Sequence, residues 1–190
     1  MRVIFKFLCL IIIFNRPCFS QEYKYEVLNN ELLKISFAQD SSFVRFKNEA
    51  GNYLNGQKKI IYLDGSRSLV SFIDGFPDGK WVIEDNEGVI ISISDYKKGM
   101  KHGYAIYYYL NGNKRFVAKY INGYQEGKQE MYYYSGILGG EFYCKHGKKH
   151  GIETWYNEED NSIKKISYFI EGKEVDKSEY LKRELGSIPN

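Results

Sequence analysis

Glycines recur along this chain with a fixed step of 24 residues, in three separate registers. The registers are Gly79, Gly103, Gly127 and Gly151; Gly75, Gly99, Gly123 and Gly147; and Gly88, Gly112 and Gly136. A single period shared by three registers indicates a chain built from repeated structural units, each packing mainly on its neighbours. The period therefore predicts a repeat architecture.

Each unit alternates about seven residues rich in Tyr, Ile, Val and Trp with a turn signal such as Asn111-Gly112 or Asn122-Gly123. Aromatic and β-branched runs that are interrupted by glycine cannot sustain the 3.6-residue period of a helix. One repeat is thus predicted to be one β-hairpin. About five such 24-residue hairpins over residues 56–176 are predicted to form an elongated, twisted antiparallel meander, an all-β fold.

Equivalent positions of successive units carry bulky side chains. Four residues after the corner glycines stand Ile83, Tyr107, Met131 and Trp155; one residue further stand Glu84, Tyr108, Tyr132 and Tyr156; before the glycines of the second strands stand Tyr96, Tyr120, Cys144 and Phe169. Alternate strand residues point to opposite faces, so both faces of the predicted sheet carry large side chains. Cys144 occupies an otherwise aromatic column and is interpreted as a buried small apolar residue.

Residues 1–20 combine Arg2 and Lys6 with an apolar run over 7–14 and small residues at Cys18 and Ser20. This pattern predicts a cleavable secretory signal peptide, and the apolar run is too short to span a bilayer, which needs roughly 20 residues. We therefore expect the periplasm, the cell envelope or secretion. Without this segment Lys plus Arg falls from 27 to 24 and equals the 24 Asp plus Glu, which argues against a nucleic-acid partner.

The segments that flank the repeats have less regular patterns. Residues 21–55 contain strand-like pieces and are expected to form N-terminal strands or a cap, because open repeat arrays need their ends covered. Residues 177–190 are expected to form a C-terminal helix and tail, since Asp176 or Ser178 is a suitable N-cap and Leu181 and Leu185 have helical spacing.

A resemblance to MORN repeats (membrane occupation and recognition nexus) covers residues 56–176. It is carried by the units YKKGMKHGYAIYYYLNG, YINGYQEGKQEMYYYSG and YCKHGKKHGIETWYN. They look most like the bacterial variant with a Tyr-x-x-Gly-x-x-x-Gly corner and a Tyr-Tyr-x-x-Gly strand end. The resemblance implies an open sheet of hairpins used for binding or scaffolding, with no chemistry set by the motif.

Proteins with this variant are often described as antitoxin components or membrane-binding proteins, so the resemblance leaves an antitoxin-like or peripheral membrane role open. The lysine-rich corners Lys97-Lys98 and Lys148-Lys149 are suited to weak contact with anionic lipid. The formally neutral mature chain limits the expected attraction.

Two arrangements of residues have the composition of a chemical site. Cys144, His146 and His150 have spacings compatible with zinc or copper, but His102, His146 and His150 each directly precede a repeat glycine and are interpreted as part of the corner motif. No serine lies in a sequence that resembles a nucleophile elbow, which argues against an esterase or protease. We expect no metal and no cofactor. Paired carboxylates of a glycan hydrolase would come from Glu153 with Glu158, Glu159 or Asp160.

The aromatic rows are the main candidate for a binding surface, with Tyr107, Tyr109, Tyr133 and Trp155 as its residues. Exposed Tyr and Trp side chains anchor protein partners or stack on sugars, and the alternative is that they form the core of a thin sheet. The sequence predicts an exported, non-enzymatic binding or scaffold module for a protein or glycan partner in the cell envelope. The alternatives are a small envelope glycan hydrolase and a membrane-associated or antitoxin-like protein.

Overall fold

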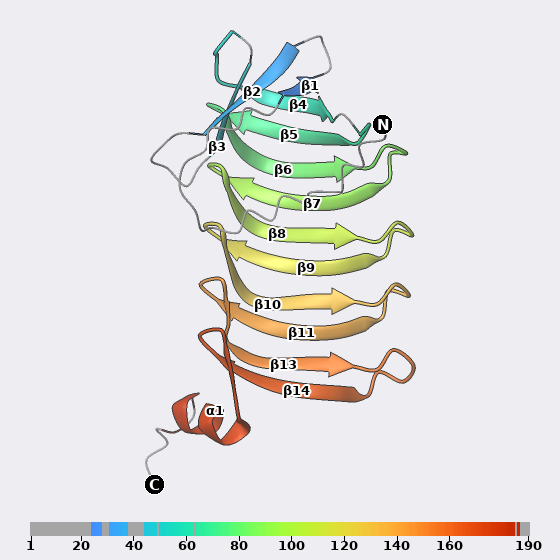
Figure 1. Ribbon diagram of the computed structural model, residues 1–190, viewed down its shortest axis with the longest axis vertical. Helices are drawn as coiled ribbons and strands as arrows, with labels where there is room; N and C mark the ends of the chain where they lie inside the picture. The colour runs from blue at the N-terminus through green and yellow to red at the C-terminus, as the bar shows by residue number, and fades with distance from the viewer. Residues whose placement is uncertain are drawn as a thin grey trace, which may run out of the picture.

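The computed structural model describes residues 24–27, 31–37, 44–48, 50–62, 64–184 and 186. Most of them belong to one open antiparallel sheet in which β4 to β15 follow chain order, apart from the short β12, which pairs with β11 (Figure 1). The strands are β1 Lys24–Val27, β2 Glu31–Phe37, β3 Val44–Asn48, β4 Gly56–Ile61, β5 Arg67–Ile73, β6 Phe76–Glu84, β7 Ile90–Lys97, β8 Met100–Tyr108, β9 Lys114–Ile121, β10 Tyr124–Tyr132, β11 Leu138–Lys145, β12 Lys148–Lys149, β13 Gly151–Tyr156, β14 Ile163–Ile170 and β15 Lys173–Val175. The predicted elongated meander of hairpin repeats is confirmed.

The corners between successive hairpins are two-residue turns. Lys98 and Gly99 have φ angles of 51° and 83°, and Asn122 and Gly123 have φ angles of 49° and 86°. Two adjacent positive φ angles are the signature of a type I′ turn, whose twist matches that of the flanking strands. The equivalent pairs are Asp74-Gly75, His146-Gly147 and Glu171-Gly172. The 24-residue glycine step therefore reflects a turn geometry that is repeated at one edge of the sheet.

The loops within each hairpin lie at the opposite ends of the strands from the corner turns. In one of them the Tyr109 amide donates to the carbonyl of Asn113 at 2.8 Å, and the Gly112 amide donates to the carbonyl of Tyr109 at 2.9 Å. Asn111 Oδ1 accepts a further bond from the Asn113 amide at 3.0 Å. Polar turn residues thus satisfy the loop backbone in place of a strand partner.

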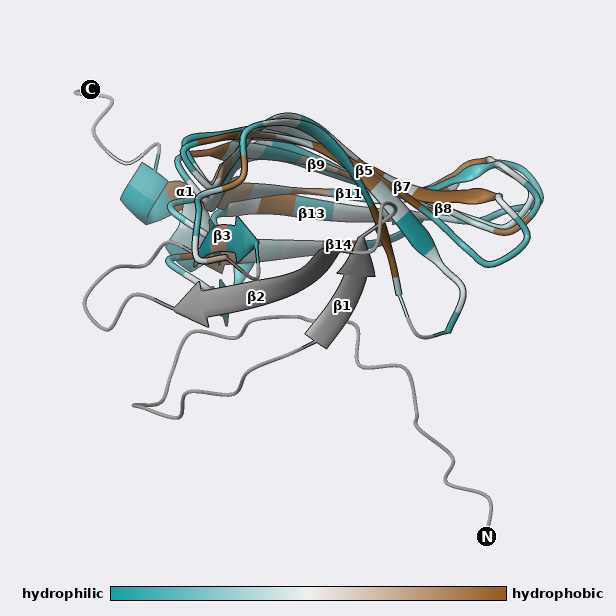
Figure 2. Ribbon diagram, turned by 90° about the horizontal axis from the view of Figure 1, so that it is seen from above, coloured by the Kyte–Doolittle hydropathy of each residue, from teal (hydrophilic) through white to brown (hydrophobic). Residues whose placement is uncertain are grey.

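The sheet is curved, as the view along its long axis shows (Figure 2). The strands bend into an arc, and β3 lies on the inner side, which we call the concave face. On the other, convex face the residues Leu69, Val82, Ile93, Ile106 and Val117 oppose one another across β5 to β9. Side chains of the concave face are the more buried of the two sets: Ala105 and Ala118 are 0% exposed, whereas Leu69 is 41% exposed.

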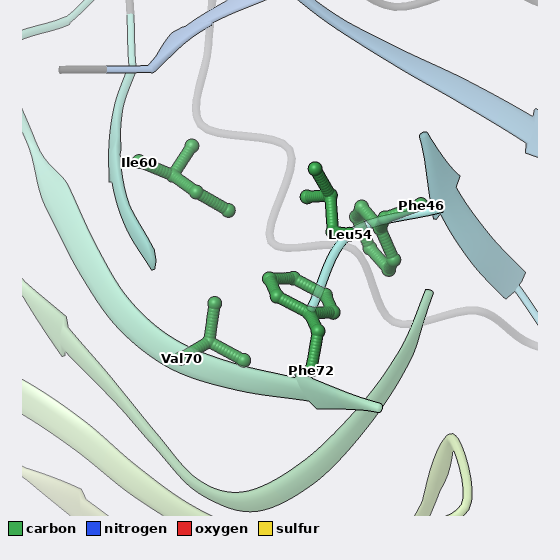
Figure 3. Packing of buried hydrophobic residues seen from close by; sticks show 5 residues of the cluster. All are labelled: Phe46, Leu54, Ile60, Val70 and Phe72. Carbon is green, nitrogen blue, oxygen red and sulfur yellow. The ribbon is translucent and has the colours of Figure 1, made fainter. Parts of the chain in front are cut away.

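A compact apolar cluster closes the N-terminal end of the concave face. Figure 3 shows Phe46 and Leu54 facing Ile60, Val70 and Phe72, which project from β4 and β5. The Phe46 and Phe72 rings lie 5.0 Å apart. The Phe46 amide also donates to the carbonyl of Gly75 at 2.8 Å, so β3 is held to the first corner of the repeats by backbone as well as by side chains. This cluster shields the first hairpins from water.

The predicted C-terminal helix is confirmed as α1, Lys177–Glu184. Asp176 is its N-cap, since Asp176 Oδ1 accepts from the Glu179 amide at 2.8 Å. Bonds from Ser178 and from the Glu179 amide lower the pKa of Asp176. The helix packs beside β14 through Tyr180, whose ring lies 5.3 Å from that of Tyr168. Within the described part of the chain, no helix has the length and apolarity that a membrane span requires.

Candidate binding face

Three rows of side chains cross the strands of the concave face, because residues of antiparallel strands that are directly opposed, or two positions away from the opposed residue, project to the same side. The first row is Ile83, Ser92, Tyr107, Phe116, Met131, Gly140 and Trp155; the second is Trp81, Ser94, Ala105, Ala118, Gln129, Phe142, Glu153 and Ser167; the third is Tyr96, Lys101, Tyr120, Gln125, Cys144, Lys149 and Phe169. The repeats therefore place aromatic and polar side chains in columns along the long axis of the molecule.

Three residues of the first two rows, Tyr107, Phe116 and Phe142, form a ladder of stacked rings. The rings of Tyr107 and Phe116 lie 6.1 Å apart and those of Phe116 and Phe142 lie 6.2 Å apart, both pairs in stacked arrangements. Tyr107, Phe116 and Trp155 remain partly exposed. Gly140 stands where the preceding hairpin has Phe116, and a Cβ there would lie 2.9 Å from Trp155 Cε3. The missing side chain therefore leaves the space that the Trp155 ring occupies.

Two lysines lie among these rings at equivalent positions, each two residues after the glycine of a two-residue corner turn, Gly99 or Gly147. Lys101 Nζ lies 5.4 Å from the Tyr107 ring centre and 5.1 Å from that of Tyr120. Lys149 Nζ lies 4.9 Å from Phe142 and 4.8 Å from Phe169. Such placement over ring faces stabilises a cation in a partly apolar setting.

The ammonium group of Lys101 is charged at neutral pH. Burial acts to lower the pKa of Lys101, but interactions with Tyr96 and Tyr107 outweigh burial, and the pKa is raised overall. Burial also raises the pKa of Tyr96, which keeps that hydroxyl protonated. Near the corner turns, the concave face thus presents the positive charge of Lys101 beside neutral tyrosine hydroxyl groups.

The four aromatic residues singled out from the sequence fall into two places. Tyr107 and Trp155 lie in the first row of the concave face, whereas Tyr109 and Tyr133 lie where the strands end at the loop edge. Tyr109 Oη donates to the carbonyl of Tyr132, and Tyr133 Oη donates to that of Tyr156, both at 2.7 Å. Each of these two tyrosines therefore links its own hairpin loop to the following hairpin.

The residues of the possible metal motif are dispersed by the fold. Cys144 lies in the third row of the concave face, and His146 is the positive-φ residue of a corner turn. His150 Nε2 lies 3.5 Å from Glu184 of α1, while His102 Nδ1 lies 3.2 Å from Asn122 Oδ1 at the neighbouring corner. Across the described ranges, no group of three or more His, Cys, Asp or Glu side chains is close enough to hold a metal ion.

Cys144 is buried, with 4% of its surface exposed, and burial raises the pKa of its thiol to about 11. Since the thiolate is the reactive form, we expect iodoacetamide at pH 8 to modify Cys144 at least about 100-fold more slowly in the folded protein than in urea. Mass spectrometry of the peptide that contains Cys144 measures both rates. Equal rates in the two states would contradict this assignment.

The acidic residues of the last hairpin do not form one group. Glu153 is 5% exposed in β13 and bonds to Lys149, with Glu153 Oε1 lying 2.5 Å from Lys149 Nζ. Glu158, Glu159 and Asp160 instead lie in the loop after β13, beside Tyr133 and Lys164, where they line a shallow open depression. Asp160 Oδ1 accepts from the Ser162 amide at 3.0 Å, which is the role of a turn residue.

Lys101 and Gln129 were not among the residues expected to form a site, and Lys149 was expected only as part of a lysine-rich corner that contacts anionic lipid. Gln129 is 0% exposed at the centre of the second row, and its Oε1 has no hydrogen-bond partner within the part of the chain that the structure describes. The sequence shows that the two lysines are equivalent, because Lys101 and Lys149 come two residues after Gly99 and Gly147. Their significance depends on which side of the sheet is concave, and a repeat period carries no such information.

No protein-family model matches the chain, and a search of curated proteins finds no matching sequence. The resemblance to MORN repeats therefore rests on the quoted motifs alone.

Proposed function

We propose that this chain is an exported, non-enzymatic repeat protein that binds a protein or glycan partner of the cell envelope through its concave face. The observation that carries the proposal is the composition of that face. It combines partly exposed aromatic rings, Tyr107, Phe116 and Trp155, with the lysine ammonium groups of Lys101 and Lys149. Large rings with polar neighbours are the residues that dominate binding energy in protein recognition.

A capture experiment tests the use of the concave face. The full chain with a C-terminal tag is incubated with envelope extract of its source, beside the double variant Tyr107→Ala/Trp155→Ala. The matched control is Tyr104→Ala/Tyr143→Ala, which removes tyrosines that are 53% and 43% exposed in strand positions of the convex face. We expect the wild type and the control to retain the same partner and the concave variant to lose it.

Circular dichroism establishes that each variant is folded. If the double variant unfolds, Trp155→Leu keeps an apolar side chain in the row and serves as the second test. A folded concave variant that retains the partner would overturn the proposal.

Export is part of the proposal, and residues 1–20 lie outside the described residues. Cleavage after Ser20 predicts a mature protein that begins at Gln21. Intact mass measurement of the protein recovered from the cell envelope or the medium is expected to give the mass of residues 21–190. Recovery of the full-length chain from the cytoplasm alone would contradict export.

A further inference from the structure

Lys101 and Lys149 occupy the same position of two repeats but differ in their electrostatic partners. Lys149 Nζ lies 2.5 Å from Glu153 Oε1, four residues further along the chain. The residue four positions after Lys101 is Ala105, which is 0% exposed. The repeat thus provides a carboxylate for one lysine and a methyl group for the other.

Lys101 has no carboxylate partner within the described ranges. Its Nζ donates to Tyr107 Oη at 2.8 Å and lies over the rings of Tyr107 and Tyr120, and Tyr96 lies opposite it on β7. An ammonium group has three donors, so two N–H groups remain available after the Tyr107 bond. Tyr107 accepts in that bond, which leaves its own hydroxyl proton free to donate in the same region.

The Tyr107 and Tyr120 rings and the Tyr107 hydroxyl keep Lys101 charged, while its two remaining N–H groups can still donate to an anion. We propose that Lys101 and the Tyr107 hydroxyl form an anion site that binds a carboxylate of an acidic polypeptide segment. This inference rests on the proposed function, because it requires the concave face to be the binding face.

The arrangement of the rings favours a peptide over an acidic glycan. Sugars bind aromatic residues by lying on a free ring face. Here Tyr107, Phe116 and Phe142 stack on one another, and Lys101 lies over the rings of Tyr107 and Tyr120. The faces are therefore occupied within the protein, whereas the lysine and hydroxyl donors suit the carboxylates of Asp and Glu side chains.

The spacing of the two lysines suits an extended chain. Four strand intervals separate β8 from β12 in the sheet, a distance of about 19 Å. An extended peptide of about six residues covers this length. A short acidic peptide can therefore reach both lysine positions at once.

Titration calorimetry at low salt with blocked hexaglutamate tests the site on the full chain. We expect wild-type binding that weakens as sodium chloride is raised to 0.5 M, and no binding of blocked hexaglutamine. Lys101→Met is expected to weaken hexaglutamate binding about tenfold or more. The matched control Lys119→Met removes the same charge from an exposed position of the opposite face and is expected to change the affinity less than twofold.

Two further variants exchange the partners of the two lysines. Ala105→Glu gives Lys101 the carboxylate that Lys149 has, and we expect it to weaken binding as much as Lys101→Met does. Glu153→Gln releases Lys149 and is expected to strengthen binding at least threefold. If Ala105→Glu does not fold, Lys101→Met and Glu153→Gln still decide the question.

The outcomes distinguish this site from the proposed function. The anion site is overturned if hexaglutamate does not bind to the wild type or binds independently of Lys101. In that case, partner capture that still needs Tyr107 and Trp155 would continue to support the concave face as the binding face. Lys101-dependent binding of tetragalacturonate but not of hexaglutamate overturns the peptide and assigns the site to a glycan. Lys101-dependent binding only to vesicles with anionic lipid likewise overturns it in favour of a membrane surface.

Discussion

Replacement of Phe72 by alanine is expected to lower the free energy of unfolding by about 3–5 kcal/mol, the usual cost of removing a buried phenylalanine. Phe72 is 2% exposed and packs against Phe46, with ring centres 5.0 Å apart. The other cluster residues lie in strands or, for Leu54, are held by backbone hydrogen bonds to Phe46 and Gly75, so they cannot move far to fill the space. Chemical denaturation followed by circular dichroism measures the loss.

The same substitution is expected to detach β3 and residues 50–55 from the concave face. The Phe46 and Leu54 amides, which donate to the carbonyls of Gly75 and Phe46 respectively, should then exchange with deuterium much faster than in the wild type. The control is Leu110→Ala, since Leu110 is 69% exposed in a hairpin loop. We expect that control to cost less than about 0.5 kcal/mol. Equal losses for the two variants would show that the cluster does not stabilise the N-terminal end.

Replacement of Gly103 by alanine is expected to cost about 2–4 kcal/mol through strain and steric overlap together. Gly103 has a φ angle of 117°, and a Cβ built there lies 2.8 Å from both Cβ and Oδ2 of Asp95. Asp95 cannot withdraw easily, because Asp95 Oδ2 accepts from the Tyr104 amide at 3.0 Å and Asp95 Oδ1 binds Lys80 Nζ at 2.9 Å. Thermal unfolding measures the loss.

Gly112→Ala separates the two contributions to this loss. Gly112 has a φ angle of 85°, but no heavy atom lies within 4 Å of its Cβ position. This variant therefore carries backbone strain without a steric clash, and we expect a cost of about 1 kcal/mol. If Gly112→Ala is as destabilising as Gly103→Ala, contact with Asp95 is not the cause.

The two faces of the sheet differ in how their composition changes along the molecule. Along the convex face, the aliphatic side chains of Val82, Ile93 and Ile106 in the first hairpins give way to Glu130 and Glu141 further along. Lys128 Nζ bridges these carboxylates at 3.2 and 2.6 Å. The concave face instead keeps its aromatic rows over several repeats. Aromatic side chains in the first two rows therefore set the concave face apart from the charged part of the convex face.

The fold could be predicted from the sequence because its determinants are local. Positive φ angles at Asn122-Gly123 and equivalent pairs make type I′ turns, and the β-branched and aromatic segments between them form strands. A regular turn spacing then pairs each strand with its neighbour. The start of α1 is also determined locally, because Asp176 caps the helix through the amide of Glu179.

The site could be predicted only in part. The columns that contain Tyr107 and Trp155 were recognised correctly as shared strand positions, since opposed residues keep a two-residue alternation. Tyr109 and Tyr133 could not be assigned in this way. They lie at strand ends, and their hydroxyl bonds to the next repeat depend on the spacing between loops.

By itself the sequence determined the repeat unit, the turns and the order of the strands, because these depend on residues close together in the chain. Only the tertiary structure decided which face is concave, since curvature results from the combined twist and packing of many strands. On that face Lys101 lies beside Tyr107 and Tyr120, whereas Lys149 pairs with Glu153. The sequence contains Ala105 and Glu153 at equivalent positions, but only the assembled sheet shows that Glu153 pairs with Lys149.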